Sequence, residues 1–118
     1  MREVRSGVRA LAGAFKTMQS EAIQSGQMQV LVIDPVENQL VVEGTERRIS
    51  LGEVVRLAKF GGVVLDAMGV ARVKFYPNGS NSGVRVLIDD AESPENLGYE
   101  VRLDPLIGSI EVLDEATS

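Results

Sequence analysis

The stretch EVRSGVRALAGAFKTMQSEAIQSG, residues 3–26, decides the fold class of this 118-residue chain. Its apolar residues recur at alternating intervals of four and three, which places them in a single stripe on an amphipathic helix. A glycine closes the stretch, as expected where a helix stops. We therefore predict one helix over residues 3–25, about 35 Å long at 1.5 Å per residue. The stripe consists of Val4, Val8, Leu11, Phe15, Met18 and Ala22.

After this helix the pattern changes to short apolar runs between turn residues, which is typical of β-strands. Segment 50–58 has two interpretations: SLGE at 50–53 fits a capping box before a short helix at 54–58, and the same letters allow a strand at 53–58. One long helix followed by strands indicates an α+β fold, with the helix on one face of an antiparallel sheet. The other expected strands are 28–33, 40–43, 46–49, 63–65, 72–76, 84–88, 99–103 and 109–113.

Length and composition predict one domain over residues 1–118, with helix in 1–26 and mostly β-structure in 27–118. Aromatic residues make up only 4% of the chain, so Val, Leu and Ile must fill most of the core. The chain has no cysteine and no histidine, which excludes disulfides, thiolate zinc sites and histidine-based catalytic triads. Its net charge of −5 disfavours binding to DNA through phosphate neutralisation.

A glycine-rich segment, FYPNGSNSGVRVLI at 75–88, poses a choice between a turn and a binding loop. Asn78-Gly79 is a strong hairpin dipeptide because both residues tolerate positive φ, and Pro77 stops strand pairing just before it. A phosphate-binding nest is the alternative, but the segment lacks the Lys-Ser/Thr of a P-loop and precedes a strand. We therefore predict a turn.

An acidic loop follows the strand expected at 84–88. Asp89, Asp90, Glu92 and Glu95 could supply oxygen ligands to calcium, although their spacing is not that of an EF-hand loop. A solvated acidic loop is the alternative interpretation. No residue pattern elsewhere points to a catalytic centre or a cofactor, so we expect that the protein is not an enzyme.

Three segments carry motifs that occur in the same order in one known family. Residues 75–83, FYPNGSNSG, resemble the F-x-P-(D/N)-G-S-x-S-G turn of the H-type minor pseudopilins of type II secretion systems. Residues 101–110, VRLDPLIGSI, resemble the closing hairpin of that family, V-D-P-x-T-G-R-(V/I). Residues 19–26, QSEAIQSG, resemble the R-S-E-A-I-x-x-G end of its long helix. Order and spacing match over about 100 of the 118 residues.

The chain departs from the family motifs at two places. Gln19 stands where the helix motif has Arg, and Ile107 and Ser109 stand where the hairpin motif has Thr and Arg around the glycine. These departures bear on the subfamily more than on the fold.

The resemblance implies a pilin-like fold, in which a long N-terminal helix packs on antiparallel sheet. It implies that a transmembrane half of the helix precedes this chain and anchors the protein in the inner membrane, with this domain in the periplasm. Methylation is also typical of the family. The implied function is that of a structural minor subunit near the tip of the pseudopilus, which helps to extrude folded proteins across the outer membrane. Other pseudopilins are the implied partners, and neither nucleic acid nor a small-molecule substrate is expected.

The resemblance also indicates where subunits would meet. In pilin-like filaments the helical spine packs in the core, so Val4, Val8, Leu11 and Phe15 would partly contact neighbouring subunits. A polar side of the same helix could meet acidic faces of partners. It includes Arg5, Arg9 and Lys16.

Two alternatives remain at this level. The fimbrial T-type minor pilins of type IV pili and DNA-uptake machines share the helix-then-sheet pattern, and DNA binding would call for a basic patch near the C-terminus. Here residues 111–115 read EVLDE, which is acidic. A free-standing binding or enzymatic module is the third possibility.

Overall fold

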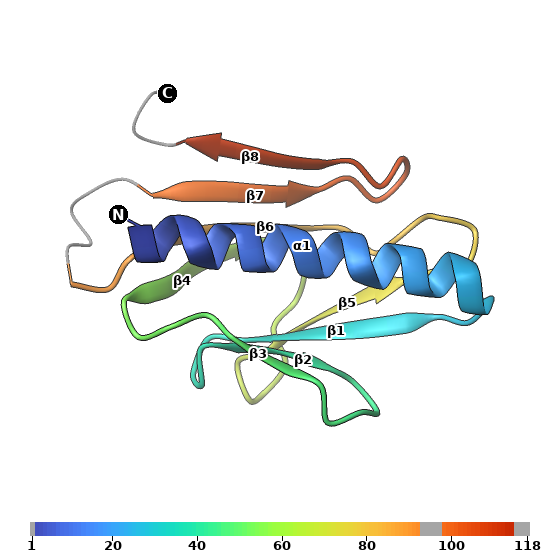
Figure 1. Ribbon diagram of the computed structural model, residues 1–118, viewed down its shortest axis with the longest axis horizontal. Helices are drawn as coiled ribbons and strands as arrows, with labels where there is room; N and C mark the ends of the chain where they lie inside the picture. The colour runs from blue at the N-terminus through green and yellow to red at the C-terminus, as the bar shows by residue number, and fades with distance from the viewer. Residues whose placement is uncertain (1, 93–97, 115–118) are drawn as a thin grey trace.

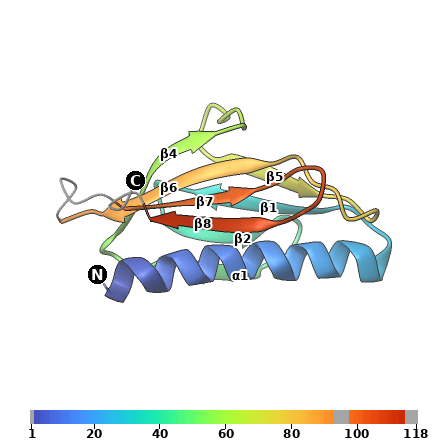
Figure 2. The same cartoon turned by 90° about the horizontal axis from the view of Figure 1, so that it is seen from above.

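The computed structural model describes residues 2–92 and 98–114, which form one helix and two antiparallel four-stranded sheets (Figure 1). The helix α1, Arg2–Ser25, runs along one side of the molecule, and both sheets lie on the same side of the helix (Figure 2). The first sheet has the order β3-β2-β1-β5 and the second the order β4-β6-β7-β8. The strands are β1 Gln29–Asp34, β2 Gln39–Val42, β3 Arg48–Ser50, β4 Val55–Gly61, β5 Ala71–Phe75, β6 Val84–Asp90, β7 Tyr99–Leu103 and β8 Ile110–Asp114. The expected α+β architecture is confirmed.

The predicted helix and its stop signal are confirmed. Gly26 has a φ of 69°, in the left-handed region, and its N–H donates to the carbonyl of Ala22 at 3.0 Å. That hydrogen bond satisfies one of the carbonyls that a helix end leaves open. The chain then turns directly into β1.

The apolar stripe of α1 forms one core with the inner faces of both sheets. All six residues of the stripe are buried, and Phe15 lies against Phe75 of β5 with a ring-centroid separation of 6.1 Å. Aliphatic side chains supply most of the remaining core, as the low aromatic content predicts. The sheet residues packed beneath the helix include Leu31, Ile33, Val73, Val86, Ile88 and Val101.

Two of the expectations for the middle of the chain need correction. Residues 55–58 belong to strand β4, so the short-helix interpretation is wrong: β4 pairs with β6, with a bulge between Leu57 and Lys59. The β-branched pair Val54-Val55 favours an extended backbone, and pairing in the sheet decides the outcome. The strand expected at 63–65 is also wrong. Gly62, with a φ of 72°, turns the chain away after β4 ends, and Val64 is exposed.

The predicted turn at Asn78-Gly79 is confirmed. The Tyr76 carbonyl accepts a hydrogen bond from Gly79 N–H at 3.0 Å, and Tyr76 N–H donates to the Ser80 carbonyl at 2.9 Å. Of the two residues of the dipeptide, Gly79 alone has positive φ, at 92°. This arrangement is a tight turn followed by one left-handed residue. The loop is therefore a connection between β5 and β6.

Candidate subunit-interface surface

The four residues predicted to contact neighbouring subunits lie inside this domain. Val4, Val8, Leu11 and Phe15 are only 0–6% exposed, because the two sheets cover the side of α1 that carries them. Their burial explains the apolar stripe through folding of the domain itself. A role for them between subunits stays a prediction.

The opposite side of α1 is exposed and basic. Arg5, Arg9 and Lys16 all lie on it. The Nε of Arg5 donates to the Tyr99 hydroxyl at 3.0 Å, and this hydrogen bond is the main cause that raises the pKa of Arg5. Within residues 2–92 and 98–114, Arg9 and Lys16 make no ion pair or side-chain hydrogen bond. These two cations are available to a partner.

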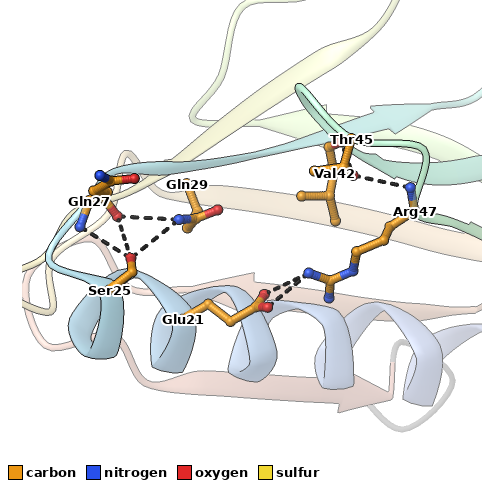
Figure 3. Close-up of polar contacts among 7 residues, drawn as sticks. All are labelled: Glu21, Ser25, Gln27, Gln29, Val42, Thr45 and Arg47. Carbon is orange, nitrogen blue, oxygen red and sulfur yellow. Dashed lines mark hydrogen bonds and ion pairs between the residues drawn. The ribbon is translucent and has the colours of Figure 1, made fainter.

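On the side of the first sheet, an ion pair ties α1 to the loop between β2 and β3. Arg47 Nη1 lies 2.8 Å and 3.1 Å from the two carboxylate oxygens of Glu21 (Figure 3). Thr45 positions the arginine, because its hydroxyl accepts from Arg47 N–H at 3.0 Å and donates to the Val42 carbonyl at 2.8 Å. Ser25 and Gln29, near the end of the helix, are also linked by a hydrogen bond.

At the C-terminal end of α1, the three motif segments meet. The Gln19 side chain donates to the Gly108 carbonyl at 3.2 Å, which joins the helix to the β7–β8 hairpin. The buried Asn81 donates to the Asp104 carbonyl at 2.9 Å, which joins the glycine-rich loop to the same hairpin. Motifs that are far apart in the sequence therefore form one structural unit. Their order along the chain gave no signal of this.

The acidic residues considered as calcium ligands do not share one site among the described residues. Asp89 lies on β6 and forms an ion pair with Arg56, and Asp90 accepts a hydrogen bond from Glu92 N–H. Glu95 lies outside the described residues. Among the residues that the structure describes, no cluster of three or more acidic, histidine or cysteine side chains could hold a metal ion. The one described helix is also not apolar enough to cross a membrane.

A model of the family described as type II transport protein GspH matches residues 7–106. The chain belongs to the GspH family. The resemblance to the H-type minor pseudopilins is thereby confirmed, and members of this pseudopilin family are structural subunits, not enzymes.

Solved structures show that the fold of this pseudopilin domain is shared. The minor pseudopilin EpsH of the type 2 secretion system of Vibrio cholerae has a TM-score of 0.73 at 16% identity, covering 95% of this chain and 97% of that one. The type IV minor pilin FimU of Pseudomonas aeruginosa has a TM-score of 0.71 at 15% identity, covering 99% and 92%. At such identities the likeness shows the pilin-like fold alone. A search of curated protein sequences gives no match.

Proposed function

We propose that this domain is a minor subunit that assembles near the tip of a type II secretion pseudopilus and helps to extrude folded proteins across the outer membrane. The observation that carries the proposal is the GspH family match over residues 7–106, in a chain whose long helix presents Arg9 and Lys16 without partners among the described residues. A structural subunit acts through surfaces, and α1 offers one from Arg5 to Ser20.

The exposed side of α1 supports attraction to acidic partners. Arg9 and Lys16 are seven residues apart, so they lie on the same side of the helix, roughly 10 Å apart along its axis. Neither has a described carboxylate partner to release before it meets a new one. Exposed charges of this kind raise the rate at which two partners associate and favour one relative orientation, and they add less to the affinity.

Family membership also supports a location. The full-length protein would be held in the inner membrane by a single helical segment, with this domain in the periplasm. There it would contact the other pseudopilins of the same filament.

The test is assembly with those pseudopilins. The full-length protein, expressed in secreting cells that lack the native copy, should restore secretion and co-purify with other pseudopilins. Calorimetry with their soluble domains measures the contact directly. No restored secretion and no contact with any pseudopilin would overturn the proposal.

The likeness to FimU favours one second candidate, a minor pilin of a type IV pilus or DNA-uptake machine. A gel-shift assay with duplex DNA at moderate salt distinguishes the two candidate functions. The secretion subunit should give no shift, whereas salt-sensitive binding would favour the second candidate.

A further inference from the structure

The inner face of the first sheet extends farther than α1 covers. Leu40 of β2 is paired with Ile49 of β3, so both side chains point to the core side of this sheet. Leu40 is buried, whereas Ile49 is 39% exposed. Within this sheet the helix packs mainly on β1. Apolar surface that faces the core is therefore open to solvent at β3.

A groove of about 290 Å³ occupies this open region, between α1 and the β2–β3 hairpin. We call it the α1–β3 groove. The helix lines it with small side chains, and, apart from its chain neighbours and the helix backbone, a methyl group added at Gly13 would meet no atom within 4 Å. Side chains this small leave space that an apolar group from outside can fill. The lining residues used below are Arg9, Gly13, Leu31, Val42, Arg47 and Ile49.

The wall of the groove is fixed by polar contacts. The ion pair between Arg47 and Glu21 spans from the hairpin to the helix, and Thr45 holds the backbone of Arg47 in place (Figure 3). A site that is already formed needs less ordering when a partner binds, which favours affinity.

The rim of the groove is positively charged, although the chain as a whole carries a net charge of −5. Arg9 and Arg47 both line it. Glu21 is the partner of Arg47, whereas Arg9 has no carboxylate partner in the described part of the chain. An occupant that combines an apolar side chain with a carboxylate matches both the lining and the rim.

We propose that the α1–β3 groove docks a segment of a neighbouring pseudopilin in which an apolar side chain lies next to an Asp or Glu. The apolar side chain fills the space over Gly13, and the carboxylate meets Arg9. This inference rests on the proposed function, because the filament supplies the neighbour.

Site-directed cross-linking tests the docking. The 118 residues contain no cysteine, so Gly13→Cys and Ser20→Cys each introduce a single thiol into them, one in the groove and one on the exposed helix outside it. A photo-reactive group is attached to each thiol in the full-length protein, in secreting cells. We expect Gly13→Cys to give at least fivefold more adduct with a pseudopilin, mapped by mass spectrometry to a segment with an apolar residue beside Asp or Glu.

The outcomes separate the two proposals. Adducts with pseudopilins from Ser20→Cys alone would overturn docking in the groove but leave assembly into the filament intact. No pseudopilin adduct from either position would overturn docking, and combined with no restored secretion and no contact in calorimetry it would overturn assembly as well. An adduct of Gly13→Cys with lipid or nucleic acid, in place of a pseudopilin, would also overturn docking.

A matched pair of charge reversals tests the role of Arg9. Arg9→Glu should reduce the Gly13→Cys adduct about tenfold, whereas Lys16→Glu, an equal change outside the groove, should leave it unchanged. Replacing the mapped Asp or Glu of the partner with Lys should restore the adduct with Arg9→Glu. Equal yields from the two reversals, both folded by circular dichroism, would contradict the proposed pairing.

Discussion

Arg56 of β4 and Asp89 of β6 are paired on neighbouring strands of the second sheet and form a bidentate ion pair. Arg56 Nε lies 2.8 Å from Asp89 Oδ1, and Arg56 Nη2 lies 2.6 Å from Asp89 Oδ2. The Asp89 side chain is only 8% exposed, while that of Arg56 is 51% exposed. The carboxylate therefore depends on this one arginine for its charge partner within the described residues, and the hydrogen bond to it raises the pKa of Arg56.

Removing the arginine should destabilise the domain. Arg56→Met leaves the buried carboxylate of Asp89 without its cation, and an unpaired buried charge is costly. The midpoint of urea unfolding should fall clearly. Lys59→Met is the matched control, since Lys59 is exposed on the same strand and makes no ion pair in the described structure. Equal midpoints for the two variants would show that the pair contributes nothing.

Asp66 should make the stability of the domain depend on pH in the acidic range. Its pKa is lowered, first by its hydrogen bond to the Arg72 guanidinium and also by accepting from the backbone N–H groups of Val70 and Met68. The folded pKa is below the ordinary value of 3.8, so this contribution is complete above pH 3.8 and is lost as pH falls through the folded pKa. As the pH falls through that range, the Asp66→Asn variant should lose less stability than the wild type. Thermal unfolding at a series of pH values measures both losses. Parallel pH profiles would contradict this assignment.

Two glycine substitutions should have opposite effects on stability. Gly79→Ala places a side chain at a φ of 92° and should destabilise the domain by about 1 kcal/mol or more. Gly13→Ala, in an open helical position, should stabilise it by about 0.5–1 kcal/mol. Thermal melting of both variants measures the difference. Unchanged melting of Gly79→Ala would mean that the turn is placed wrongly.

The core role of Phe15 predicts a large loss on truncation. Phe15→Ala removes a fully buried ring that packs on Phe75 and should cost about 3–5 kcal/mol. Lys16→Ala, the exposed neighbour, should change stability by less than about 0.5 kcal/mol. Urea unfolding of the isolated domain is the measurement. A loss of similar size in both would argue against this packing.

The parts of the fold that follow from local chemistry were predictable. The stripe from Val4 to Ala22 fixes a helix because its 3.6-residue period extends over about five turns, and Gly26 fixes its end. The turn at Gly79 follows from the conformational freedom of glycine. Local chemistry leaves short apolar runs ambiguous. Residues 55–58 form a strand because they pair with β6, whereas residues 63–65 lie outside the sheets.

Features that depend on distant parts of the chain were not predictable. β5 returns to pair with β1 although β4, which precedes it, joins the other sheet. The contact between Gln19 and Gly108 joins residues 89 positions apart. The α1–β3 groove arises because β3 extends beyond the helix, and no residue pattern in β3 predicts that the helix leaves it uncovered. Each of these needs the relative placement of two elements.

The position of α1 across both sheets has a mechanical consequence. The helix contacts strands of each sheet, including β1, β6 and β7, and its side chains are interleaved with theirs along its length. A force applied along the helix axis must therefore slide many buried side chains past one another at once. Such a force disturbs these contacts together, whereas peeling separates the strands one at a time. A force applied to the helix is therefore transmitted to both sheets, and the domain moves as one unit.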